Sequence, residues 1–115
     1  MFRLVSLNLN GIRSAATKGL IPWAEGLSAD CMGVQELKAQ MPDIQGKFEQ
    51  FAGLNGHFHC AEKKGYSGVA LYTRHEPSDV IVGLGPHDTT GEFDAEGRYV
   101  ELRFDKPGRK LSIIS

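Results

Sequence analysis

Polar side chains that can bind a metal ion follow two short apolar runs near the start of the chain. Asn8 and Asn10 lie where the first run ends, and Glu36 lies at the end of the second. One helical segment separates the runs, so they are predicted to be the parallel strands of a βαβ unit whose carboxyl ends point the same way. Ligands of α/β folds bind at that edge. Carboxylate and carboxamide oxygens there predict a site for one hard cation.

A simpler interpretation of each residue stays open when it is considered alone. Asn8 and Asn10 are also residue types that favour a turn, here before Gly11, and Glu36 could be a solvated strand end.

Apolar periodicity predicts two helices and a series of strands. The helices are expected over about 21–28 and 43–52, and the strands over 2–9, 31–37, 57–62, 68–74, 79–85, 98–104 and 110–115. A βαβα start followed by strands predicts a mixed sheet with helices on one face. Residues 2–9, 68–72 and 80–84 are apolar at nearly every position, which predicts strands buried on both faces.

The composition is that of an ordinary globular domain of 115 residues. A net charge of −1 does not indicate nucleic acid, so any basic face must be local. Cys31 and Cys60 lack metal or redox spacing, which predicts free thiols and a cytoplasmic protein. The sequence predicts no signal peptide and no membrane segment.

An apolar run, residues 110–115, ends the chain without turn residues. Leu111, Ile113 and Ile114 would form an exposed apolar edge strand, which complete domains avoid. We therefore expect residues 1–115 to be the N-terminal part of a single larger domain, incomplete at its C-terminus.

Four ordered motifs resemble those of the exonuclease III family of apurinic/apyrimidinic DNA-repair endonucleases, within the endonuclease/exonuclease/phosphatase superfamily. They are residues 6–13 (SLNLNGIR), 35–38 (QELK), 60–72 (CAEKKGYSGVALY) and 94–99 (DAEGRY). The resemblance covers nearly the whole chain. It implies the N-terminal half of a four-layered α/β sandwich with mixed β-sheets.

The resemblance also implies roles for particular residues. Glu36 resembles the carboxylate that binds the catalytic Mg²⁺, for which Mn²⁺ is a possible substitute, and Asn8 and Asn10 resemble the residues around that ion. Residues that resemble the family's DNA contacts are Arg13 and Lys18 in a loop after the first strand, Lys64, Gly65 and Tyr66 in a second loop, and Arg98 as a phosphate clamp.

Each DNA-contact residue has a plainer explanation as well. Arg13 and Lys18 could be ordinary surface cations, and the loop of Lys64 could be an exposed hairpin connection. Arg98 could pair with Glu96 or Asp94. The acidic segment that holds Asp88, Glu92, Asp94 and Glu96 is predicted to be a solvated face.

The implied activity is metal-dependent phosphodiester hydrolysis 5′ to abasic sites in double-stranded DNA, with 3′-to-5′ exonuclease trimming, by a monomeric full-length parent. The family's later motifs, a catalytic tyrosine, a Gly-Asp-x-Asn segment and a Ser-Asp-His segment, have no counterpart here. We therefore expect the isolated chain to be inactive and to self-associate through an open sheet edge.

Two alternatives remain open at this point. One is another phosphodiesterase or phosphatase of the superfamily, acting on nucleotides, inositol phosphates or sphingomyelin. The other is a non-catalytic DNA-binding or interaction fragment.

Overall fold

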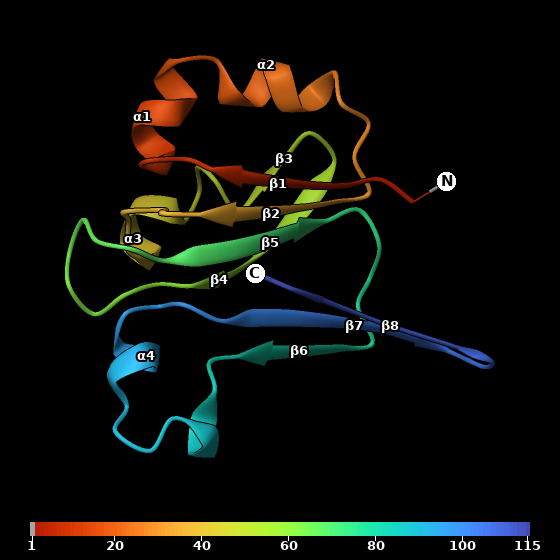
Figure 1. The fold of residues 1–115 in the computed structure, drawn as a ribbon. Coiled ribbons are helices and arrows are strands. Elements are labelled where there is room, and N and C mark those ends of the chain that lie inside the picture. The colour runs from red at the N-terminus through yellow and green to blue at the C-terminus, as the bar shows by residue number, and fades with distance from the viewer. Residues whose placement is uncertain (1) are drawn as a thin grey trace.

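Two β-sheets and short helices make up an α/β fold in the computed structural model, which describes residues 2–115 (Figure 1). The first sheet contains, in spatial order, β1 (Leu4–Asn8), β2 (Cys31–Gln35), β5 (Val69–Thr73), β4 (Leu54–His59) and β3 (Gln50–Phe51). The second contains β6 (Asp79–Val82), β7 (Val100–Lys106) and β8 (Arg109–Ile114). The helices are α1 (Ile12–Thr17), α2 (Leu20–Glu25), α3 (Met41–Ile44) and α4 (Glu92–Ala95), with a 3-10 turn over Gly85–His87.

The predicted βαβ unit and mixed sheet are confirmed. β1 and β2 run parallel, with Asn8 opposite Gln35, and every other paired strand of the first sheet is antiparallel to its neighbour. The carboxyl ends of β1 and β2 therefore lie side by side, as the sequence predicted.

Alternating side chains of the first sheet build two apolar cores. Met32 and Val34 of β2 face the helices and pack in a cluster with Ile12 and Leu20. Cys31 faces the second sheet and packs with Leu102. The described residues thus form three layers, with helices on one face of the first sheet and the second sheet on the other. Burial on both faces is confirmed for β5, whose five residues are all buried.

Gly33 allows the two sheets to approach closely at the centre of β2. A Cβ atom placed there would lie 3.5 Å from the Ser115 hydroxyl, and that hydroxyl donates a hydrogen bond of 3.3 Å to the Val34 carbonyl. The backbone of Ser115 pairs in turn with that of Val100 through bonds of 3.0 and 2.9 Å. The end of the chain is therefore fixed between the sheets.

The prediction that residues 11–19 form a loop is wrong, because α1 occupies most of them. Ala15 and Ala16 favour a helix, and Ile12, the first residue of α1, is fully buried. The first predicted helix, over 21–28, is present as α2 but begins one residue early, at Leu20, and ends at Glu25, so Pro22 lies in its first turn, where proline is tolerated.

The predicted helix over 43–52 is also wrong. α3 ends at Ile44, and Gly46 then takes a left-handed backbone with φ 76°. Phe51 lies in β3, which pairs with β4 across a two-residue turn of Ala52 and Gly53, both with positive φ. Such a turn matches the twist of a β-hairpin. The local turn therefore prevailed over the helical spacing of the apolar residues.

Burial on both faces is wrong for β1 and β6. Leu4 of β1 is 53% exposed, and Val80 and Val82 of β6 are 37% and 52% exposed. Both strands lie at sheet edges, where the described residues cover them incompletely. The expected edge strand at the end of the chain is present as β8, with Leu111 and Ile114 exposed but Ile113 buried.

No helix within residues 2–115 is both long enough and apolar enough to span a membrane.

Candidate metal centre and nucleic-acid interface

A backbone ladder joins the two strand ends beyond the sheet itself. The N–H groups of Leu9, Gly11 and Ile12 donate to the carbonyls of Gln35, Glu36 and Leu37 at 2.9, 2.8 and 2.9 Å. This ladder continues the parallel pairing of β1 with β2 into the segments that carry the polar residues. The predicted convergence of Asn8, Asn10 and Glu36 is therefore a consequence of the strand register.

Four residues form a closed ring at this edge, which we call the strand-end ring: Asn8, Asn10, Glu36 and Lys38. The Asn8 amide donates to one Glu36 carboxylate oxygen, and its carbonyl oxygen accepts the Asn10 N–H at 2.9 Å. The Lys38 ammonium donates to the Asn10 side-chain oxygen at 2.6 Å and lies 3.7 Å from the other Glu36 oxygen. Each member therefore contacts two others.

The backbone of the strand-end ring is strained. Asn10, Glu36 and Lys38 have φ values of 48°, 54° and 51°, in the left-handed region. Asn tolerates this region, whereas Glu and Lys enter it at a cost of ~1–3 kcal/mol each. Strain of this kind persists only where the surrounding structure imposes it, and it is concentrated at functional sites.

The ring offers a divalent cation one accessible carboxylate. The Glu36 side chain is 44% exposed. The Asn8 amide nitrogen faces Glu36. In this arrangement Asn8 orients the Glu36 carboxylate and does not place a second oxygen ligand beside it. Within residues 2–115 no three His, Cys, Asp or Glu side chains gather at a common point. One carboxylate with carboxamide support fits Mg²⁺, which keeps several waters in its coordination shell.

Arg13 and Lys18 lie on and after α1 rather than in a loop. Arg13 donates to the Lys38 carbonyl at 2.7 Å and lies 3.5 Å from the Asp43 carboxylate. It therefore braces the backbone of the strand-end ring. Lys18 is exposed at the C-terminal end of α1, where it lines a surface hollow of about 340 Å³ together with Asn8 and Trp23.

The loop between β4 and β5 is attached to the strand-end ring by backbone bonds. The Leu37 and Lys38 N–H groups donate to the carbonyls of Gly68 and Ser67 at 3.1 and 2.8 Å. A Cβ atom at Gly68 would lie 3.2 Å from the Leu37 side chain, so a glycine permits this approach. The loop and the ring are therefore held at the same end of the sheets (Figure 1).

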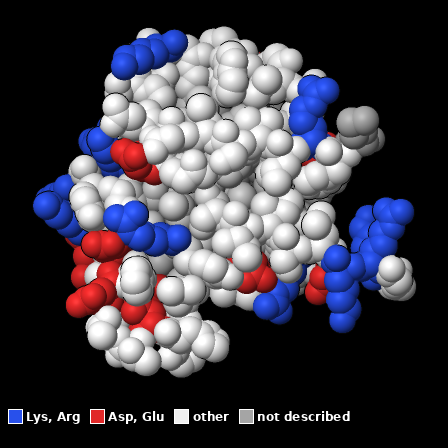
Figure 2. Space-filling model, viewed as in Figure 1, with Lys and Arg blue, Asp and Glu red and all other residues white. Residues whose placement is uncertain are grey.

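The predicted contact residues of this loop differ in exposure. Lys64 and Gly65 are exposed, and Gly65 has a left-handed backbone with open space around it. Tyr66 is half-buried, and the Lys63 ammonium lies 5.2 Å from the centre of its ring. Cations and acidic side chains are mixed over this end of the molecule, whereas a separate group of cations covers the β7–β8 hairpin (Figure 2).

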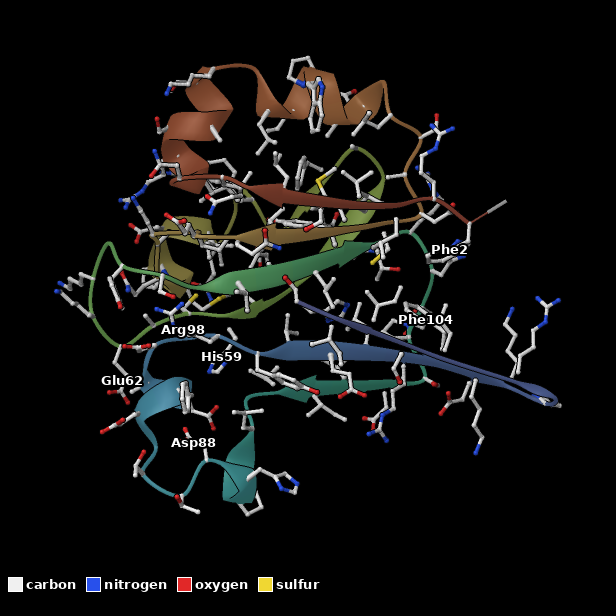
Figure 3. The ribbon with its side chains drawn as sticks, in the orientation of Figure 1. Phe2, His59, Glu62, Asp88, Arg98 and Phe104 are labelled. Carbon is white, nitrogen blue, oxygen red and sulfur yellow. The ribbon has the colours of Figure 1, made fainter. Side chains whose placement is uncertain are left out.

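Arg98 lies at the same end as this loop, near α4 (Figure 3). Its Nε donates to the Glu96 carboxylate at 2.7 Å, which is the ion pair that the sequence left open as the plainer explanation. A second guanidinium nitrogen lies 3.3 Å from the Tyr66 hydroxyl. The hydrogen bond to Glu96, followed by the one to Tyr66, raises the pKa of Arg98 above its ordinary value.

The acidic segment is not simply a solvated face. The Asp94 carboxylate accepts the N–H groups of Leu84 and Gly85 at 2.7 and 3.0 Å, and the first of these bonds is the largest cause that lowers the pKa of Asp94. Asp88 is buried and accepts the Asp94 N–H at 2.9 Å. These two residues hold α4 against the end of β6, which the sequence did not predict.

Sequence reasoning assigned no role to Lys38 and considered Glu96 only as a possible ion-pair partner of Arg98 on a solvated face, although both lie inside the quoted motifs. Each is two residues from a predicted site residue, Lys38 from Glu36 and Glu96 from Arg98. Neither pair lies in an extended segment, because Glu36, Lys38 and Gly97 all have left-handed backbones, so strand spacing gave no signal and only the folded structure shows these contacts.

Known nucleases are similar in sequence to this chain. The chain is 34% identical over 104 residues to the exodeoxyribonuclease of Bacillus subtilis (strain 168), an alignment that covers 90% of this chain and 38% of that protein. It is 29% identical to the DNA-(apurinic or apyrimidinic site) endonuclease of Dictyostelium discoideum, covering 90% and 27%. The chain thus spans less than two fifths of either relative.

A solved structure shares the fold. The catalytic domain of Xenopus laevis APE2 superimposes with a TM-score of 0.75 at 25% identity, over 96% of this chain and 42% of that one. Residues 5–110 match the model of the Endonuclease/Exonuclease/phosphatase family. Because that match covers most of the chain, this chain belongs to the Endonuclease/Exonuclease/phosphatase family.

Proposed function

We propose that this chain is the N-terminal part of a DNA-repair nuclease of the exonuclease III type. The full-length protein would hydrolyse phosphodiester bonds 5′ to abasic sites in double-stranded DNA and trim 3′ ends. The observation that carries the proposal is the strand-end ring, in which Glu36 stays accessible while Asn8 and Lys38 fix its position. The similarity to an exodeoxyribonuclease and to an apurinic-site endonuclease supports the same reaction class.

The proposed cofactor is Mg²⁺, with Mn²⁺ as a substitute. Glu36 would hold the ion, Asn8 would keep the carboxylate oriented, and Asn10 would contribute its side-chain oxygen once Lys38 moves aside. When bound, the ion would polarise the scissile phosphate and stabilise the leaving 3′ oxygen. Loss of a neighbouring partner that orients a ligand in this way typically lowers metal affinity or activity by about 10- to 100-fold.

The proposed DNA contacts lie around the ring. Lys18 and Lys64 are exposed cations, and neither forms an ion pair within residues 2–115, so they can reach phosphates without first breaking one. Gly65 lets the backbone approach the duplex, and Tyr66 offers a ring beside it. Arg13 and Arg98 already bind Asp43 and Glu96, so their contribution depends on the donors that these pairs leave free.

The site within residues 2–115 lacks an assigned general base. We propose that residues outside this chain supply it, since the matched relatives are more than twice as long. In this proposal residues 1–115 form part of one domain of a monomeric parent. Free Cys31 and Cys60 support a cytoplasmic location.

The experiment compares the 115-residue chain with a form that extends past Ser115. Both are incubated with a duplex that carries one abasic site and with a soluble phosphate ester, in Mg²⁺ and in chelator. Metal-dependent incision 5′ to the abasic site by the longer form alone is the expected result. Faster hydrolysis of the ester would indicate another phosphodiesterase of the family, and DNA binding without incision would indicate a non-catalytic role. Incision by the 115-residue chain would show that its site is complete.

A further inference from the structure

The Glu96 carboxylate connects two residues that come from different segments of the chain. One of its oxygens accepts the Arg98 Nε–H at 2.7 Å, and the other lies 3.5 Å from the Tyr66 hydroxyl. The Tyr66 hydroxyl in turn lies 3.3 Å from an Arg98 terminal nitrogen. The β4–β5 loop and the segment after α4 are therefore joined through three side chains.

The backbone that carries Glu96 and Arg98 is fixed independently of these side chains. A Cβ atom at Gly97, where φ is +62°, would lie 2.5 Å from the Cys60 carbonyl carbon, so this turn rests directly on the end of β4. The Glu62 N–H donates to the Ala95 carbonyl at 2.8 Å, and the His59 ring nitrogen lies 2.9 Å from the Tyr99 carbonyl. The turn thus keeps its place when the Glu96 side chain is changed.

The three side chains themselves contribute little to the apolar core. The side chains of Arg98 and Glu96 are 49% and 41% exposed, and exposed ion pairs contribute little to stability because water competes for both partners. Folding alone does not explain why a carboxylate holds an arginine and a tyrosine together at this place.

We infer that Glu96 is a positioning residue that holds Arg98 and Tyr66 ready to bind the DNA backbone, which deepens the proposed function and rests on it. Glu96 takes the Nε–H of a guanidinium that has five N–H donors. The two terminal nitrogens keep donors that point away from Glu96, and these suit a phosphate. A long side chain that is ordered before binding loses less conformational entropy when the ligand arrives.

The direction in which loss of Glu96 changes DNA affinity distinguishes a positioning role from a purely electrostatic one. Glu96 is a negative charge on a surface that would face phosphates, so its removal should strengthen DNA binding if charge alone matters. If Glu96 positions its partners, its removal weakens binding although a repulsive charge is lost. Glu62 is the matched control, because it is an exposed carboxylate at the same end of the molecule (Figure 3).

The test measures binding of the 115-residue chain to a fluorescent abasic duplex by anisotropy. We expect Glu96→Ala to weaken binding by about two- to tenfold, the range expected when one or two long side chains must be ordered on binding. Glu96→Gln, which keeps one acceptor oxygen, should restore part of the loss. Glu62→Ala should leave affinity unchanged or raise it.

A double-mutant cycle supplies the readout that a merely structural role would not change. In the Arg98→Ala, Tyr66→Phe background, Glu96→Ala should leave affinity unchanged or raise it, as Glu62→Ala does, because the groups that Glu96 positions are gone and only its charge remains. A further loss there would overturn the positioning role. Circular dichroism melting of each variant checks that the fold is kept. If Glu96→Ala has a lower melting temperature than the unchanged chain, Glu96→Gln replaces it in the cycle.

Two results distinguish failure of this inference from failure of the proposed function. If Arg98→Ala weakens binding while Glu96→Ala behaves like Glu62→Ala, the DNA contact stands and the role of Glu96 is wrong. If Arg98→Ala and Tyr66→Phe leave binding unchanged, or the chain does not bind the duplex, the DNA contact itself is wrong and the inference falls with it.

Discussion

The Asn8 side-chain amide donates a hydrogen bond to the Glu36 carboxylate across 28 positions of sequence. The bond connects the ends of two parallel strands and directs a carboxylate that is otherwise half in solvent. Asn8 leaves its own oxygen to the Asn10 N–H. The predicted metal site is therefore organised as one carboxylate with a dedicated orienting partner.

Glu36→Gln should abolish most of the metal-dependent turnover of the full-length protein, by orders of magnitude, while DNA affinity stays largely intact. The substitution keeps the size of the side chain and removes the charge that a divalent ion needs. Steady-state incision of an abasic duplex measures the turnover, and fluorescence anisotropy with the same duplex measures the DNA affinity. Glu25→Gln on α2, an exposed carboxylate, is the control. Unchanged rates in Glu36→Gln would show that Glu36 does not hold the metal.

Asn8→Ala should lower the affinity of the chain for Mn²⁺ by about 10- to 100-fold, the usual cost of losing a partner that orients a metal ligand. The substitution removes the donor to Glu36 and leaves the backbone ladder in place. Titration followed by electron paramagnetic resonance measures free Mn²⁺ directly and needs no enzyme activity. Asn55→Ala, an exposed position on β4, should leave the affinity unchanged. An equal effect of both substitutions would contradict the orienting role of Asn8.

Gly97→Ala should destabilise the fold more than Gly91→Ala. Both glycines have left-handed backbones, with φ 62° and 78°, and an alanine there costs ~1–2 kcal/mol. Gly91 has open space around it, whereas a Cβ atom at Gly97 would meet the backbone of Cys60 at 2.5 Å. Overpacking adds ~1–3 kcal/mol at Gly97.

Urea unfolding of the two glycine variants measures this difference. The loss of unfolding free energy in Gly91→Ala measures the cost of the left-handed backbone alone. Any additional loss in Gly97→Ala therefore measures the clash with Cys60. Equal unfolding free energies would mean that the turn after α4 does not rest on β4.

Cys31 should resist thiol reagents in the folded chain. Burial raises the pKa of its thiol to about 11, so at pH 8 only ~0.1% is thiolate, the form that reacts. Cys60 is half-buried, and burial followed by the nearby Asp43 raises its pKa as well. We expect Cys60 to react slowly and Cys31 to react only on unfolding.

Absorbance with a disulfide reagent follows both thiols, and the Cys60→Ser variant isolates Cys31. Reaction should accelerate as pH rises toward the pKa of each thiol, because the thiolate fraction grows. Rapid labelling of Cys31 at pH 8 without denaturant would contradict its position between the two sheets.

The 115-residue chain should self-associate through an open sheet edge. β8 is an edge strand of the second sheet, and its Leu111 and Ile114 are 44% and 57% exposed. Arg109 and Lys110 place charge at the start of β8, so we expect pairing with other chains through its uncharged residues 111–114. Sedimentation should therefore show species larger than the 12.6 kDa chain.

Ile114→Lys should shift that equilibrium toward monomer, because the charge stands on the exposed edge. Thr17→Lys adds the same charge to exposed α1, away from the strand, and should have no such effect. A well-folded monomer of the unchanged chain would contradict the expected association.

Sequence reasoning performed best where strand order alone fixes the outcome. The parallel pairing of β1 with β2 and the meeting of Asn8, Asn10 and Glu36 followed from a βαβ pattern and a shared strand direction. It failed at residues 43–52, where helical spacing of apolar side chains competed with a left-handed Gly46 and a hairpin turn. Periodicity measures which side chains are buried, and it does not show where the backbone turns.

The sequence by itself determined the residue types of the site and the strands that carry them, because strand direction and the position of polar residues at strand ends are local properties. Only the tertiary structure decided how each group is used. Asn8 turns its nitrogen to Glu36, Lys38 closes the strand-end ring, and Glu96 joins Arg98 to Tyr66. These arrangements depend on hydrogen bonds between segments that meet only after folding, so no local pattern specifies them.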